Sequence, residues 1–341
     1  MPAFRHVLVP VVTAALLLAA CGDDDDAATT TDASAEDGGS EADRPTVVVT
    51  TSMLGDIVEN LVGDQAEVVT VMPAGADPHD FQASAQQANQ IRQADALIVN
   101  GAGFEEGLLD VIESAEGDGV ATFEVISAVD SIEFGEGGHG HDDEDGHSDE
   151  EEAHEEEDGH EHDGADPHFF LDPVRTATAA AGIGDFLAEA VEAIDADALE
   201  GSVTAYVEEL EALHDEVEAA LADIDDDRRV LVTNHDSFGY FADRYDFEIV
   251  GTVIPSGSTT DGANAGDLAR LAQLIREEGV PAIFSDTSAG EGLAGTLADE
   301  VGGDVAVVEL FTESLGQDGS GGETYVEMIR ANAQSIAGAL A

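Results

Sequence analysis

The chain has 341 residues, enough for two lobes of ordinary domain size. It carries 76 Asp and Glu residues against 10 Lys and Arg residues, a formal net charge of -66, which excludes binding to nucleic acids and to anionic lipid headgroups. This charge suits either a protein that binds cations or one that works in high salt, and composition alone does not decide between them.

Residues 1–21 have the pattern of an export signal. A positively charged start precedes an apolar run from Val7 to Leu18, which is too short to span a bilayer. The run leads to Cys21, the one cysteine of the chain, in a setting that resembles the lipobox of bacterial lipoproteins. We expect a lipid anchor on Cys21 and a location outside the cytoplasm, at the cell membrane. The alternative is an ordinary cleaved signal with an incidental cysteine.

Residues 22–44 are rich in Asp, Ala, Thr and Gly and predict a disordered acidic tether. From residue 45 onward, β-branched runs alternate with stretches of helical periodicity. The strands are expected at 46–50, 67–72, 96–100 and 120–125, and the helices at 53–61, 83–93 and 104–114. This alternation is typical of a mostly parallel sheet with helices on both faces, and we assign 45–196 to an N-terminal α/β lobe.

Residues 135–166 interrupt this lobe with Gly, Asp, Glu and His and hardly an apolar side chain, which predicts a disordered surface loop. Six of the 11 histidines lie in this loop: His139, His141, His147, His154, His160 and His162. Imidazoles among carboxylates could form a weak, multi-site trap that raises the local metal concentration. The alternative is an acidic loop that only adds solubility.

Helical periodicity resumes at Pro173 and continues to about residue 194. A long helix is then expected over 197–227, because apolar side chains recur every three or four residues from Val203 to Ile224. Strands and helices alternate again over 228–341, the C-terminal α/β lobe. The strands are expected at 229–233, 247–253, 282–285 and 305–310, and the helices at 238–243, 268–278, 293–301 and 324–339. The fold class is therefore α/β, with two lobes joined by a long helix and a ligand crevice where the strand ends meet.

Three histidines outside the loop share a setting at a strand end or a helix start, facing the expected crevice: His79, His168 and His235. Each has a carboxylate nearby in the sequence that could orient the ring through its second nitrogen. Three imidazoles suit Zn²⁺, whose tetrahedral shell leaves a fourth position for a carboxylate or water. From spacing alone, the three could equally be unrelated loop residues. His214 lies on the polar side of the long helix and is expected to be solvated.

The chain resembles the metal-specific solute-binding proteins of ABC importers over about residues 46–341. Four blocks carry the resemblance and follow in the family's order: GADPHDFQAS at 75–84, DPHFFLDP at 166–173, TNHDSFGYFADRY at 233–245 and FTESLG at 311–316. The resemblance implies one metal ligand from each block: His79, His168, His235 and Glu313. The family usually has Asp at the last of these positions, so Glu313 departs from its pattern by one methylene, and Asp286 or water could serve instead.

The resemblance also implies a function. We expect an extracytoplasmic protein, monomeric and without enzymatic activity, that captures a divalent metal ion and delivers it to an ABC permease in the membrane. The linking helix would be rigid and would limit lobe movement. Three histidines with one carboxylate favour zinc, whereas two of each would favour manganese. The alternatives are a manganese or iron carrier of the same class, and a zinc hydrolase, although the sequence holds no HExxH run.

Overall fold

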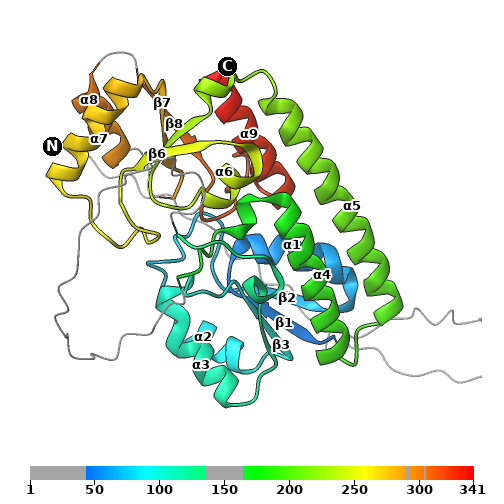
Figure 1. The fold of residues 1–341 in the computed structure, drawn as a ribbon. Coiled ribbons are helices and arrows are strands. Elements are labelled where there is room, and N and C mark those ends of the chain that lie inside the picture. Colours follow the sequence, from blue (N-terminus) through cyan, green and yellow to red (C-terminus); the bar gives the residue numbers. More distant parts are fainter. Residues whose placement is uncertain (1–43, 135–163, 289–291, 303–304) are drawn as a thin grey trace, which may run out of the picture. The chain divides into compact units, whose positions relative to one another are not determined.

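The structure, a computed structural model, describes residues 44–134, 164–288, 292–302 and 305–341 (Figure 1). The chain divides into two compact units, Met1–Glu41 and Ala42–Ala341, and all the described residues belong to the second. Cys21, the tether up to residue 43 and the six histidines of the loop lie outside the described residues. The expectations for these segments stay predictions.

The first lobe is built on a sheet of four parallel strands. These are β1 (Thr46–Val49), β2 (Glu67–Thr70), β3 (Ala96–Val99) and β4 (Thr122–Glu124), in the order β2-β1-β3-β4. The central strands β1 and β3 consist almost entirely of aliphatic residues, and nearly all of them are buried, as expected for parallel strands with both faces covered.

Helices cover both faces of this sheet. The first three are α1 (Ser52–Val62), α2 (Ala85–Arg92) and α3 (Leu109–Gly117). Successive side chains of a strand point to opposite faces. Val47 and Val49 therefore pack in the core that contains α1, whereas Val48 packs in the core that contains α2 and α3.

The second lobe repeats the same strand order. Its strands are β5 (Val230–Thr233), β6 (Glu248–Thr252), β7 (Ala282–Asp286) and β8 (Ala306–Leu310), all parallel and in the order β6-β5-β7-β8. Its helices are α6 (Gly239–Tyr245), α7 (Ala265–Glu278), α8 (Gly292–Val301) and α9 (Tyr325–Leu340). In a 2-1-3-4 order the connections diverge between the first and third strands, so each sheet opens a crevice at the carboxyl ends of its strands.

Two consecutive helices join the lobes. α4 (Pro173–Ala190) is followed by α5 (Ala196–Leu221), which packs against α1 and α4 on one side of the junction and against α9 on the other (Figure 1). The buried face of α5 has the three- and four-residue spacing that predicted one long helix: Leu199, Tyr206, Leu210, Leu213, Val217 and Leu221.

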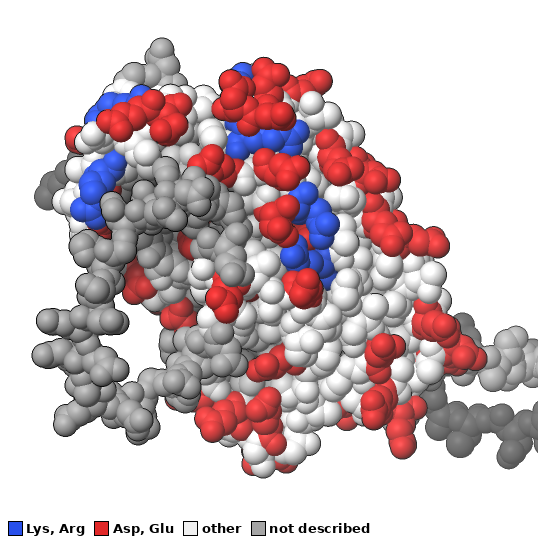
Figure 2. All heavy atoms as spheres, viewed as in Figure 1, with Lys and Arg blue, Asp and Glu red and all other residues white. Residues whose placement is uncertain are grey.

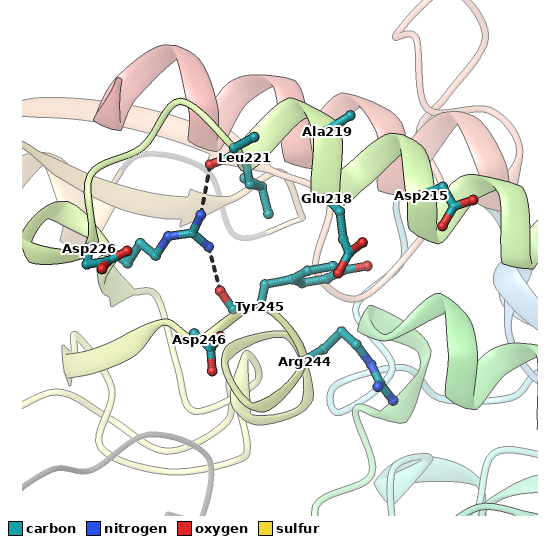
Figure 3. A pocket seen from close by; sticks show the side chains of 10 residues that line it. Asp215, Glu218, Ala219, Leu221, Asp226, Arg244, Tyr245 and Asp246 are labelled. Atoms are coloured by element: carbon teal, nitrogen blue, oxygen red, sulfur yellow. Dashed lines mark hydrogen bonds between the residues drawn. The ribbon is translucent and has the colours of Figure 1, made fainter.

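Arg229 ties the end of α5 to the end of α6. Its guanidinium donates to the carbonyl oxygens of Leu221, at 3.1 Å, and of Tyr245, at 2.7 Å (Figure 3). A cation near the unsatisfied carbonyls at two helix ends is favourable. A hollow of about 610 Å³ lies beside this junction, and none of the four predicted metal ligands lines it.

The two-lobe α/β class predicted from the sequence is confirmed, and the largest difference in a helix start is five residues. The helix expected at 104–114 begins only at Leu109, after a 3₁₀ turn over Glu106–Leu108. The reason is Glu105, whose buried carboxylate folds back to accept from the amide of Asn100, at 2.6 Å, and from the hydroxyl of Thr50, at 2.5 Å. These contacts hold the preceding loop out of helical geometry.

Within the described ranges, no helix combines the length and the apolar character needed to cross a membrane.

Candidate metal centre

The four predicted ligands come from loops at the carboxyl ends of the two sheets. His79 follows β2, His168 precedes α4, His235 follows β5 and Glu313 follows β8. All four are buried, and each offers one ligand atom within 4.8 Å of those of the others. The structure therefore brings together residues that no local spacing in the sequence connects, two from each lobe.

The three imidazole rings point their Nε2 atoms at one carboxylate. The Nε2 atom of His235 lies 2.7 Å from Oε1 of Glu313, that of His168 lies 3.4 Å from the same oxygen, and that of His79 lies 3.3 Å from Oε2. The ring centroids lie 5.4 to 6.1 Å apart. The three Nε2 atoms and the carboxylate thus surround one point in space, as the ligands of a single metal ion do.

The five atoms that could bind a metal are the three Nε2 atoms and the two carboxylate oxygens of Glu313. All five are buried, and none makes a hydrogen bond of ordinary geometry to a described residue. Buried polar atoms of this kind cost free energy unless they find a partner. Three imidazole nitrogens and one carboxylate are the donor set that Zn²⁺ accepts in a tetrahedral shell. The residues therefore fit a divalent transition metal as their shared ligand.

Carboxylates hold two of the rings in this orientation. Oδ1 of Asp166 lies 2.6 Å from Nδ1 of His168, and Oε1 of Glu106 lies 3.0 Å from Nδ1 of His79. A proton on Nδ1 shared with a carboxylate leaves the lone pair on Nε2, where it can bind a metal. Sequence reasoning pointed to a nearby carboxylate for both rings, but it missed Glu106, which lies 27 residues from His79.

The expectation that a carboxylate orients the ring of His235 is wrong for the described part of the chain. Its Nδ1 atom is buried and has no hydrogen-bond partner there. The backbone holds this residue instead, because its carbonyl oxygen accepts from the hydroxyl of Thr233, at 2.9 Å, and from the amide of Ser237, at 3.0 Å. The ring is thus positioned by the turn that follows β5 rather than by an acid.

Asp286 supports the site from behind. Its carboxylate accepts from the amide of Ser288, at 2.7 Å, and from the hydroxyls of Ser288 and Thr312. Because Thr312 precedes Glu313, Asp286 anchors the loop that carries Glu313, and it is not part of the cluster of converging donors. Glu313 itself lies buried in a loop between β8 and α9.

Burial and mutual attraction oppose each other in the electrostatics of the cluster. Burial raises the pKa of Glu313, but attraction to His235 and His168 outweighs it and holds this pKa well below its usual range. Burial lowers the pKa of His168, but Asp166 and Glu313 raise it to about 10. The pKa of His79 is raised as well, because Glu313 outweighs burial. Without a metal, His79 and His168 therefore hold protons more firmly than free imidazoles do, and a metal ion would displace these protons.

Aromatic side chains shield the cluster from solvent. The ring of Phe104 lies 5.3 Å from that of His79 and 5.6 Å from that of His168, measured between centroids. A hollow of about 250 Å³ opens beside His79, and its lining includes Phe134 and the carboxylates of Glu106 and Asp261. Figure 2 shows Asp and Glu spread over the visible face with few Arg side chains, and a field of this sign favours the approach of cations.

The histidine of the linking helix does not belong to the cluster. His214 was expected to be solvated, but its side chain is only 21% exposed. Its Nδ1 atom lies 3.2 Å from the hydroxyl of Tyr245, and the two rings pack 5.6 Å apart. The expectation was wrong because α6 covers this part of the helix.

Comparison with known proteins agrees with the site. Residues 47–339 match the model of the family described as ZnuA, zinc-uptake complex component A, periplasmic. The manganese-binding lipoprotein MntA of Halalkalibacterium halodurans is 26% identical over 297 residues, which cover 86% of this chain and 88% of MntA. The zinc-binding protein TroA of Treponema pallidum is 28% identical over 304 residues, which cover 87% of this chain and 89% of TroA.

The fold agrees as well. The structure titled periplasmic zinc binding protein TroA from Treponema pallidum matches with a TM-score of 0.74 and 27% identity, over 87% of this chain and 99% of that one. The resemblance carried by the four sequence blocks is thereby confirmed. The chain belongs to the family of periplasmic zinc-uptake complex component A proteins.

Proposed function

We propose that this chain captures one divalent transition metal ion, zinc in preference to others, and delivers it to the membrane permease of an ABC importer. One observation carries the proposal. Three Nε2 atoms and the carboxylate of Glu313 converge in a buried site, two ligands from each lobe, with no hydrogen-bond partner among the described residues. The relatives whose names state a metal-binding role support the same class of function.

The donor set favours zinc. Nitrogen donors from three histidines suit a d¹⁰ ion with tetrahedral preference, whereas manganese prefers more oxygen donors and a larger shell. Manganese is the second candidate, because one relative is named as a manganese-binding lipoprotein. The choice between the two metals therefore depends on His235, the ligand that makes the set rich in nitrogen.

The same geometry argues against hydrolysis. A catalytic zinc keeps a position for water beside three protein ligands, and it needs a general base. Here four protein donors would fill a tetrahedral shell. We therefore infer a carrier without enzymatic activity, held outside the cytoplasm by a lipid on Cys21. The lipoprotein names of relatives are in line with this anchor.

Capture would proceed by exchange of protons for metal. The ion would approach through the hollow beside His79, which is lined by two carboxylates. Binding would displace protons from His79 and His168 and would put the metal ion in their place as the positive charge beside Glu313. Because each lobe supplies two ligands, the bound ion would stabilise the lobes in contact, and release to the permease would require them to part.

The test is a titration of purified apo protein with zinc and manganese in the presence of a competing chelator. We expect one tight zinc site per chain and weaker manganese binding, and loss of the tight site in His235→Ala. A variant without residues 136–165 separates the tight site from weak binding by the loop. A tight site that survives His235→Ala would contradict the proposal.

A further inference from the structure

The segment 254–260 follows β6 in the second lobe and begins beside the third histidine of the cluster. The amide of Ile254 donates to the carbonyl oxygen of Asn234, at 2.8 Å, and the amide of Asp236 donates to the carbonyl oxygen of Ser256, at 2.9 Å. These two bonds lie on either side of His235 in the sequence. The start of the segment therefore holds the backbone that carries this ligand.

The end of the segment reaches across to the groups that hold His79 in the first lobe. The hydroxyl of Thr259 donates to Oδ2 of Asp77, at 2.6 Å, while Oδ1 of Asp77 accepts the backbone amide of His79, at 2.9 Å. The hydroxyl of Thr260 lies 3.4 Å from Oε2 of Glu106, whose other oxygen holds the ring of His79. Both acids that orient His79 are thus contacted by neighbouring hydroxyls of the second lobe.

The middle of the segment contacts the surroundings of the remaining histidine. A Cβ atom at Gly257 would lie 2.2 Å from ring carbons of Phe134, so this aromatic side chain packs directly on the bare glycine backbone. The ring of Phe134 in turn lies 6.3 Å from the ring of His168. Segment 254–260 therefore contacts the groups that hold His235 and His79, and an aromatic ring that lies beside His168.

We propose that Thr259 is a positioning residue for metal retention, which acts on His79 through Asp77 and makes the first-lobe ligand depend on contact with the second lobe. The inference rests on the proposed function. With one oxygen of Asp77 held by Thr259, the other is fixed toward the amide of His79; without the hydroxyl the carboxylate can rotate and the loop loosens. Separation of the lobes would break the same bond, so His79 would be freed in the movement that withdraws His235 and Glu313.

The test is the rate at which zinc leaves the loaded full-length protein into an excess of chromophoric chelator. Thr259→Val removes the hydroxyl and keeps the shape, and we expect zinc to dissociate about 10-fold faster or more, the range seen when a group behind a metal ligand is lost. Thr259→Ser retains the hydroxyl and is expected to release zinc at the wild-type rate. Thr296→Val, the same change at an exposed position of α8, is the matched control.

A double-mutant cycle shows whether the effect passes through Asp77. In an Asp77→Ala background, Thr259→Val is expected to cause no further acceleration, because the acceptor is already gone. The melting temperature of each apo variant is measured as well, so that all release rates are compared at a temperature where the variants are fully folded.

Three results would overturn the inference: a wild-type release rate in Thr259→Val, equally fast release in Thr259→Ser and Thr259→Val, or additive effects in the cycle. Each of these leaves the proposed function intact as long as the wild-type protein binds one zinc ion tightly. Failure of the wild-type protein to bind zinc would contradict the proposed function itself.

Discussion

Asp166 holds His168 at two points with a single oxygen atom. Its Oδ1 accepts the backbone amide of His168, at 2.9 Å, and lies 2.6 Å from the ring Nδ1. The backbone carbonyl of Asp166 accepts the hydroxyl of Tyr240 from the second lobe, at 2.6 Å. The loop of this ligand is thus fixed before any metal arrives, and it is fixed in part by the opposite lobe.

Asp166→Asn tests this support. The amide can still accept hydrogen bonds, but the negative charge that makes the imidazole a stronger donor is lost. We expect zinc affinity to fall by about 10-fold to 100-fold, as is typical when a group that orients a ligating histidine is changed. Chelator competition measures the change. Asp80→Asn removes the same charge from an exposed position in the block of His79, and it should leave the affinity nearly unaltered.

His235→Glu tests metal preference. The change replaces a nitrogen donor by oxygen and yields two histidines with two carboxylates, a set that suits manganese better than the present one. Zinc affinity should fall, and the ratio of manganese to zinc affinity should rise, in competition titrations of the apo protein. If this ratio stays at the wild-type value, His235 does not bind the metal.

The pH dependence of zinc binding follows from the protons on the imidazoles. The pKa of His168 is raised from 6.5 to about 10 in the metal-free cluster, and that of His79 is raised too, so zinc must displace protons over the neutral range. Zinc affinity should therefore fall as pH falls from 7.5 to 5, and binding near neutral pH should release protons. Calorimetry in buffers of different ionisation enthalpy counts these protons; an affinity that is independent of pH would contradict protonated ligands.

The metal-free protein should show the opposite trend above neutral pH. A raised folded-state pKa of His168 contributes stability that is fully present below about 6.5, its ordinary value, and is lost as pH rises toward 10. The lowered pKa of Glu313 contributes stability that is present above 4.5, its ordinary value, and is lost as pH falls well below it. Denaturant unfolding should find the apo protein more stable at pH 6 than at pH 9, with the stabilisation by zinc larger at pH 8 than at pH 5.5.

Asp172→Ala tests the contact between the lobes away from the metal. The buried carboxylate caps α4 through the amide of Val174, and it pairs with Arg175 and, in the second lobe, with Arg244, each at 2.8 Å. Removal of a buried partner leaves charges unpaired and a helix uncapped, and it should lower the free energy of unfolding by about 3 kcal/mol or more. Urea unfolding measures the loss.

Asp243→Ala is the matched control for this change. Asp243 also pairs with Arg175, at 3.0 Å, but its side chain is 49% exposed. Exposed ion pairs contribute about 0–1 kcal/mol because solvent screens them. Equal losses in the two variants would show that burial of Asp172 does not decide its contribution.

The sequence alone determined the fold class and the identity of the cluster. Alternating strands and helices are local patterns with periods of two and 3.6 residues, so they can be recognised without knowledge of the partners in space. The four blocks named His79, His168, His235 and Glu313, and the structure places these four together. A carboxylate that orients His168 could also be expected from the sequence, because Asp166 lies only two residues from this histidine.

Only the tertiary structure decided how these residues meet. The convergence of three Nε2 atoms on one carboxylate depends on which loops the parallel sheets bring to one edge, and no periodicity encodes that order. The partner of His79 proved to be Glu106, Asp286 proved to support Glu313 from behind, and Thr259 reached Asp77 across 182 residues. Hydrogen bonds between distant loops form only after the two lobes have folded and packed, so the sequence holds no local sign of them.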